Sequence, residues 1–162
     1  ISPSVVKTLN PGLMGFRSNS DIWDLRADRL ELPEDASRFE FTPIHFGAVL
    51  GLAAAIDELL EMGMDEVWRH DLELADHLIR GAEGLGIEVV SPTSESERSA
   101  IVSLRMPSGL SSVEVSNRLQ SEYSILTTSR SGMLRVSPHI DNELSQIDSL
   151  VAALSEILSQ VR

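Results

Sequence analysis

Residues 133–158, MLRVSPHIDNELSQIDSLVAALSEIL, decide the fold of this chain, because their periodicity changes from that of a strand to that of a helix. Residues 133–137 predict a β-strand, which Pro138 ends. After Asn142 the apolar residues recur at helical steps, at Leu144, Ile147, Leu150, Val151, Leu154 and Leu158. One face of this helix must therefore pack on a sheet.

The alternation of strands and helices extends back to residue 87. Residues 87–90, 100–106 and 125–128 predict three more strands, and Ser112 caps a predicted helix that ends near Glu122. Together with residues 133–158 these elements follow the order ββαββα. We therefore predict an α+β fold of two layers, with helices on one face of a mixed or antiparallel sheet.

Two helices are predicted ahead of the first strand. Thr42 is a good N-cap and Pro43 suits the first helical position, so the Ala- and Leu-rich run through Leu60 predicts a largely buried helix. After Gly63, Asp65 caps a second helix, whose apolar stripe contains Val67, Trp68, Leu72, Leu74, Ala75, Leu78 and Ile79. The predicted order is thus αα-ββαββα.

Residues 1–41 differ from the rest of the chain. They contain turn signals such as Asn10-Pro11-Gly12 but no long apolar periodicity. We predict that residues 1–41 connect to another domain and that residues 42–162 form a small domain.

Composition excludes several classes of function. The formal net charge of −12 repels phosphate backbones and anionic lipids, so nucleic acid is not an expected partner. The sequence has no cysteine, which excludes disulfides, thiolate nucleophiles and cysteine-ligated zinc from this chain. Its longest apolar stretch, residues 46–56, is too short to cross a bilayer. We expect no membrane insertion and a cytoplasmic location.

Two motifs carry a family resemblance. Residues 134–142, LRVSPHIDN, with Ile147-Asp148 behind them, resemble the R-x-S-x-x-x-Y-N signature and trailing I-D-x-L of class V aminotransferases and cysteine desulfurases. Residues 38–43, RFEFTP, are similar to the R-F-E-x-G-T-P segment of that family. The chain thus resembles the C-terminal part of a pyridoxal-phosphate (PLP) enzyme of fold type I, whose small domain has the predicted architecture.

The resemblance assigns Arg135 to the α-carboxylate of an amino-acid substrate. A planar guanidinium can donate two parallel hydrogen bonds to a carboxylate, which would orient the substrate over the cofactor. For an isolated arginine in a strand, an ordinary ion pair is the alternative. Arg130 lies in the loop before this strand, where it either binds a second polar group of the substrate or is solvated.

Other residues of the two motifs have structural alternatives. The family's G-T threonine contacts the cofactor phosphate of the neighbouring subunit, but an ungapped comparison places Thr42 on the glycine, and N-capping explains Thr42 equally well. His45 could approach the same phosphate or be a buried residue of the helix start. Ser137 and Asn142 are expected to be structural, and His139 either supports the local fold or reaches the active site.

The Schiff-base lysine of the family lies in an H-K motif that this sequence lacks. Lys7 is the only lysine and has none of that context, so we predict an ordinary surface residue. The domain that binds most of the PLP cofactor, and the catalytic lysine, are therefore expected upstream of this chain. This fragment alone should be inactive, and the resemblance also implies a homodimer.

The resemblance leaves several reactions open. Desulfuration needs a cysteine on the loop before the carboxylate arginine, and residues 127–132, TTSRSG, contain none. Transamination, carbon–sulfur lyase chemistry and epimerisation use the same carboxylate contact. A non-catalytic α+β interaction domain and a regulatory pseudoenzyme are the alternatives without catalysis.

Overall fold

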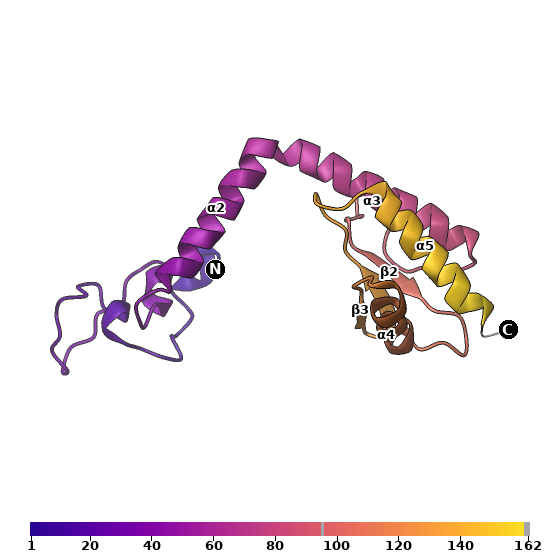
Figure 1. The fold of residues 1–162 in the computed structure, drawn as a ribbon. Helices are drawn as coiled ribbons and strands as arrows, with labels where there is room; N and C mark the ends of the chain where they lie inside the picture. The colour runs from indigo at the N-terminus through magenta and orange to yellow at the C-terminus, as the bar shows by residue number, and fades with distance from the viewer. Residues whose placement is uncertain (95, 161–162) are drawn as a thin grey trace. The chain divides into compact units, whose positions relative to one another are not determined.

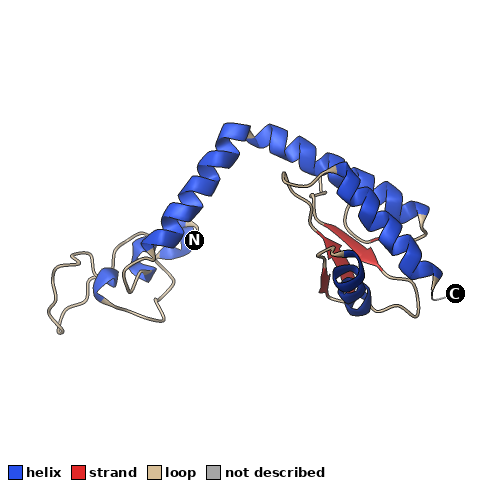
Figure 2. Ribbon diagram, in the orientation of Figure 1, coloured by secondary structure: helices blue, strands red, loops and turns tan. Residues whose placement is uncertain are grey.

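The computed structural model describes residues 1–94 and 96–160. The chain forms two compact units, Ile1–Glu58 and Leu59–Arg162. Figures 1 and 2 show short helical turns and loops in the first unit and a sheet with helices in the second. Helix α2 (Phe46–Met62) crosses the boundary between the units.

A four-stranded antiparallel sheet forms the centre of the second unit. Its strands are β1 (Glu88–Val89), β2 (Val102–Arg105), β3 (Thr128–Arg130) and β4 (Met133–Val136), and their spatial order is β1-β2-β4-β3. Leu134 and Val136 of β4 face the core, so Arg135, the one residue between them, lies on the opposite face. The alternation of buried and less buried residues along β4 therefore determines which side chains lie on the face away from the helices.

Three helices pack on the core face of the sheet: α3 (Met64–Gly84), α4 (Ser112–Tyr123) and α5 (Leu144–Ser159). Their buried side chains join those of the strands in one cluster, whose largest members include Leu74, Leu78, Leu104, Leu119, Leu134, Leu154 and Ile157. The helices α2 and α3 precede the strands, so the predicted order αα-ββαββα and the α+β class are confirmed. The sheet is antiparallel throughout.

The third strand begins later than predicted. Ser124 ends α4 in the left-handed region with φ of 58°, and the Ile125 amide donates back to the Leu119 carbonyl. Residues 125–127 therefore lead out of the helix, and the strand starts at Thr128. Ser131 and Gly132 then form a tight two-residue turn, both with positive φ, which is the geometry that matches the twist of a hairpin.

Helix α2 differs from its prediction at its start and in its burial. It begins at Phe46, where the His45 Nδ1 accepts a hydrogen bond of 3.0 Å from the Ala48 amide, so Thr42 is not its N-cap. No residue of α2 is buried within the described part of the chain, and Leu50, Leu52 and Leu60 are all exposed. Apolar composition predicted burial, but burial also requires a packing partner.

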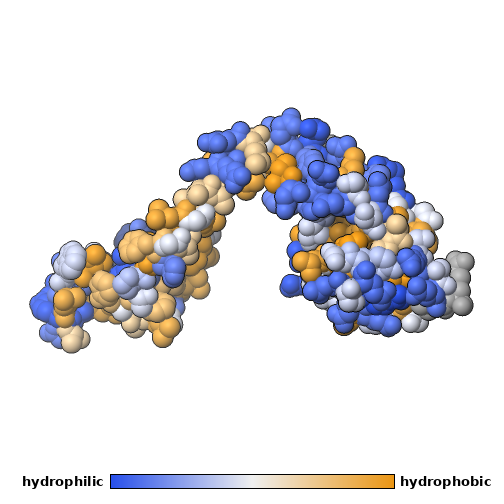
Figure 3. All heavy atoms as spheres, in the orientation of Figure 1, coloured by the Kyte–Doolittle hydropathy of each residue, from blue (hydrophilic) through white to orange (hydrophobic). Residues whose placement is uncertain are grey.

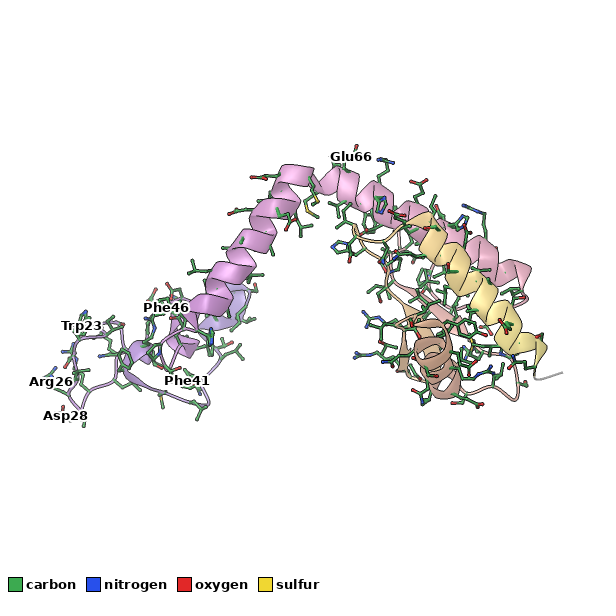
Figure 4. The ribbon with its side chains drawn as sticks, viewed as in Figure 1. Trp23, Arg26, Asp28, Phe41, Phe46 and Glu66 are labelled. Atoms are coloured by element: carbon green, nitrogen blue, oxygen red, sulfur yellow. The ribbon has the colours of Figure 1, made fainter. Side chains whose placement is uncertain are left out.

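Residues 1–41 of the first unit have little regular structure, which agrees with their lack of a long apolar period. This segment contains α1 (Pro3–Val6) and two 3₁₀ turns, η1 (Phe16–Ser18) and η2 (Ala36–Phe39). Polar contacts hold these turns together: the Arg17 guanidinium pairs with Glu40 at 2.8 Å, and the buried Ser18 hydroxyl donates to the Glu40 carbonyl. Trp23, in contrast, projects into solvent (Figure 4).

Candidate functional site

Arg135 lies in β4 on the sheet face opposite the helices. Its neighbours in the chain, Leu134 and Val136, point into the core, and Arg135 is half-buried on the other side. Ser103 of β2 and Thr128 of β3 are its partners in the antiparallel register. Side chains directly opposite each other share a face of the sheet, so Arg135 is flanked by two small hydroxyl residues that leave space around its guanidinium.

Arg130 lies on the same face of the sheet, in a strand and not in the predicted loop. It pairs with Met133 next to the turn and is exposed. Its position is diagonal to Arg135, because Thr128, two residues earlier in β3, pairs with Arg135. Diagonal neighbours on adjacent strands are about 7–8 Å apart, within the joint reach of two long side chains. The sheet therefore presents two guanidinium groups on one surface.

These two arginines differ from most others in the chain. Arg105, also on this face, is paired with Glu88 at 2.9 Å, and Arg98 and Arg118 are paired with acidic residues as well. Within residues 1–94 and 96–160, neither Arg130 nor Arg135 has a carboxylate partner. In a chain of net charge −12, two uncompensated cations on one surface favour an anionic ligand.

The hydroxyl of Ser137 orients the Arg135 guanidinium. The Arg135 Nε donates to the Ser137 Oγ at 3.1 Å. This contact uses the Nε–H of Arg135. The two terminal nitrogens, Nη1 and Nη2, can therefore donate in parallel to a carboxylate. Ser137 was expected to be structural, and its position beside the guanidinium connects it directly to the candidate site.

A short turn follows Ser137 and is attached to α3. The His139 Nδ1 lies 2.8 Å from the Asp71 Oδ2, and the His70 Nε2 lies 2.9 Å from the Asn142 carbonyl oxygen. Asn142 closes the turn, because its Oδ1 accepts from the His139 amide at 3.0 Å. Asn142 therefore caps this turn, whereas the N-cap of α5 is Glu143, whose amide donates to the Gln146 side chain.

Sequence reasoning missed Asp71, although a signal was present. Asp71 occupies a position in the apolar stripe of α3, four residues after Val67 and four before Ala75, and all three are buried. A carboxylate on the buried stripe of a helix requires a polar partner. His139 is that partner here, and only the tertiary fold brings together residues 68 positions apart.

The residues named for the cofactor phosphate lie in the other unit. Thr42 and His45 are both exposed, and the Thr42 hydroxyl donates to the Pro43 carbonyl at 3.4 Å. Lys7 is exposed and paired with Glu34 at 2.7 Å, which agrees with its prediction as a surface residue. Among the described residues no cluster of acidic or histidine side chains could hold a metal ion. The described helices also include none long and apolar enough to cross a bilayer.

Known proteins resemble this chain over its whole length. No family model matches it. A probable cysteine desulfurase of Pyrococcus abyssi is 24% identical over 175 residues, covering 100% of this chain and 42% of that protein. The solved cysteine desulfurase of Thermococcus onnurineus NA1 is 24% identical over 99% of this chain and 42% of its own, with a TM-score of 0.83.

A solved complex of the cystine C-S lyase C-DES with its product, cysteine persulfide, is also similar, at 22% identity and a TM-score of 0.81 over 96% of this chain and 41% of its own. These structures show the fold. The chain spans about two fifths of the length of the relatives it matches, and it is similar to a C-terminal part of a class V aminotransferase-like PLP enzyme, as the two motifs predicted.

Proposed function

We propose that this chain is the C-terminal domain of a PLP-dependent enzyme that acts on an amino acid, and that Arg135 binds the substrate α-carboxylate. The observation that carries the proposal is Arg135, a half-buried residue whose guanidinium donates to Ser137 and lacks a carboxylate partner among the described residues. Similarity to cysteine desulfurases over the whole chain supports the same class of enzyme.

The chain would orient the substrate and would not hold the cofactor covalently. PLP supplies an electron sink for bonds at the substrate α-carbon, and the protein selects which bond breaks by orientation. The only lysine, Lys7, is engaged by Glu34 on the surface, so the covalent attachment belongs to polypeptide outside this chain. The exposed hydroxyl of Thr42 and the imidazole of His45 are the groups of the first unit that fit an anionic phosphate.

Arg130 would bind a second polar group of the substrate. Its guanidinium shares the face of Arg135, and the diagonal offset suits a ligand with two anionic ends. A substrate with only one carboxylate would contact Arg135 alone. Loss of Arg130 should therefore weaken binding of a substrate with two carboxylates more than binding of one with a single carboxylate.

Carbon–sulfur bond cleavage is the second candidate reaction beside transamination. Similarity to a cystine C-S lyase favours it. The hairpin before Arg135 consists of three strand residues and a two-residue turn, and it contains no cysteine that could accept sulfur. A lyase that releases its sulfur product needs no such thiolate, whereas the thiolate mechanism of a desulfurase does. Homodimer formation stays a prediction from the resemblance, and a cytoplasmic location stays a prediction from the composition.

Steady-state kinetics of the full-length enzyme test the carboxylate assignment. The Arg135→Ala substitution removes charge-assisted hydrogen bonds of about 1.5–3 kcal/mol, so kcat/KM should fall roughly 10- to 150-fold. Arg105→Ala is the matched control, since Arg105 lies on the same face but is paired with Glu88, and its kcat/KM should change less than about twofold.

An Arg135→Ala enzyme with unchanged KM and kcat would defeat the assignment. A full-length protein without the visible absorption of bound PLP would instead favour the non-catalytic interaction domain. That measurement separates loss of one contact from the absence of cofactor chemistry.

A further inference from the structure

The turn between β4 and α5 is fixed to α3 at both of its ends. At the first end, His139 contacts the Asp71 carboxylate at 2.8 Å. At the other end, the His70 Nε2 donates to the Asn142 carbonyl oxygen at 2.9 Å. A carboxylate and a carbonyl only accept hydrogen bonds, so both imidazoles act as donors. Two successive residues of one helix thus hold a turn that comes about 70 positions later in the chain.

Asp71 is an unusual residue to place at this position. It is only 7% exposed, and its Oδ1 is buried without a hydrogen-bond partner among the described residues. A buried carboxylate is costly unless it is paired, and an apolar residue would fit the stripe of α3 at lower cost. The contact of its Oδ2 with His139 is therefore the one interaction that accounts for an acid at this site.

The turn leads directly to the candidate site. Ser137 precedes the buried Pro138, and His139 follows it, so the backbone between Ser137 and His139 is restricted on both sides. The Ser137 hydroxyl in turn accepts from the Arg135 Nε at 3.1 Å. A displacement of His139 would move Ser137 and release the guanidinium from its present orientation.

We propose that Asp71 and His139 are positioning residues that, through Ser137, fix the orientation of the Arg135 guanidinium. The contacts among Asp71, His139, Ser137 and Arg135 lie within this chain and do not depend on the proposed function. Only their benefit to substrate binding rests on it. Neither Asp71 nor His139 touches the ligand in this proposal. Their role is to hold the turn so that the carboxylate-binding nitrogens of Arg135 are already oriented before the substrate arrives.

Nuclear magnetic resonance of the 162-residue chain tests the positioning directly. The readout is the rate at which the Arg135 Nε–H exchanges with water, since its hydrogen bond to Ser137 slows that exchange. His139→Ala should accelerate it about fivefold, which corresponds to a net hydrogen bond of about 1 kcal/mol. His139→Asn should restore slow exchange, because the asparagine Nδ2 occupies the place of the imidazole Nδ1 and can donate to Asp71.

A second histidine–aspartate pair provides the matched control. His77 of α3 lies 2.6 Å from Asp148 of α5, away from the turn, and Asp148 is more exposed than Asp71. His77→Ala should leave the Arg135 signal unchanged. A folded His139→Ala chain with an unchanged Arg135 exchange rate overturns the proposal, as does an equal effect of His77→Ala. If His139→Ala does not fold, Asp71→Ala gives the same test, because it removes the acceptor of the same hydrogen bond from a position where an apolar residue suits the α3 stripe.

Kinetics of the full-length enzyme separate this proposal from the proposed function. If both hold, His139→Ala should raise KM for the amino acid about fivefold and change kcat less, with rescue by His139→Asn. If the exchange rate of Arg135 changes but KM does not, the positioning is correct and the carboxylate assignment fails. If KM rises while the exchange rate stays constant, the positioning role is wrong.

Discussion

The two units of the chain are held together by different interactions. In residues 59–162, apolar side chains from three helices and four strands share one core, and several of them are completely buried. In residues 1–58, Val6 is the one buried apolar residue among those described, and Ser18 and Asn19 are the buried polar ones. Large apolar residues of the first unit are instead exposed, among them Leu13, Trp23, Leu25, Phe46, Leu50 and Leu52. Figure 3 shows hydrophobic surface, drawn in orange, on this unit.

This difference shows where each unit obtains its stability. The second unit removes its apolar side chains from water, at about 25 cal/mol for each Å² buried. The first unit depends on hydrogen bonds and exposed ion pairs, which contribute about 0–1 kcal/mol each. That residues 1–41 connect to another domain stays a prediction, and such a contact would cover part of this exposed apolar surface.

The largest expected effect on stability is the difference between two leucine substitutions, one in a buried helix position and one in an exposed helix position. Leu119 of α4 is 0% exposed and Leu52 of α2 is 63% exposed. Leu119→Ala should lower the free energy of unfolding of residues 59–162 by about 2–5 kcal/mol, because it leaves a cavity. Leu52→Ala should change that free energy by less than about 0.5 kcal/mol. Urea unfolding of both variants, followed by circular dichroism, measures the difference.

Equal destabilisation by the two leucine substitutions would contradict the comparison. It would mean that α2 is packed in solution, in the 162-residue chain or in an association of two copies. Sedimentation analysis at two protein concentrations would distinguish these two explanations, since only association depends on concentration.

A smaller effect is expected at Gly81, in the second unit. A Cβ added to Gly81 would lie 2.5 Å from the Val151 Cγ2, so α3 and α5 approach each other closely here. Gly81→Ala should gain up to about 1 kcal/mol in helix propensity but lose about 1–3 kcal/mol to overpacking, so destabilisation wins. Thermal unfolding measures the sign.

Two variants control this prediction. Gly84→Ala changes the same helix at a position with nothing within 4 Å of the added Cβ, so it should be neutral or stabilising. Val151→Ala in the Gly81→Ala background should recover part of the loss. A stabilising Gly81→Ala, or additive effects in the double variant, would show that the helices can separate freely at this point.

The elements that the sequence predicted well have a local signal. Strand β4 and helix α5 were found because apolar residues alternate in one and recur at helical steps in the other, and burial follows that pattern in the structure. The position of Arg135 between Leu134 and Val136 is part of the same pattern. The side of the sheet on which Arg135 lies could thus be predicted before the helices were placed.

The features that the sequence did not predict depend on distant contacts. The start of β3 depends on how α4 ends at Ser124, and the exposure of α2 depends on the absence of a packing partner among the described residues. The lack of a carboxylate beside Arg130 and Arg135, among the described residues, depends on where the fold places the acidic side chains, and the sequence gives no local sign of it. The Asp71 contact had a local sign in the α3 stripe, but its partner His139 had none.

The smallest predicted effect concerns the acidic residues that support the first unit. The Lys7 side chain lowers the pKa of Glu34, the Ser37 side chain lowers that of Asp35, and the Arg26 side chain lowers that of Asp24. A carboxyl group whose pKa is lower in the folded state stabilises that state at pH values above its unfolded pKa. This contribution is lost as the pH falls through the lowered, native pKa. Acid should therefore loosen residues 1–58 slightly while the apolar core of residues 59–162 persists.

Carbon-detected titration of these carboxyl groups measures the effect. The midpoint of Asp35 should lie below the ordinary value for aspartate, and Ser37→Ala should return it toward that value, because both the Ser37 hydroxyl and amide donate to its Oδ1 but only the hydroxyl is removed. Since Glu34 and Asp35 are exposed and only Asp24 is partly covered, the loss of stability should be small. A large acid transition confined to residues 1–58 would instead show that ion pairs, and not the turns closed by Ser18 and Asn19, hold that unit together.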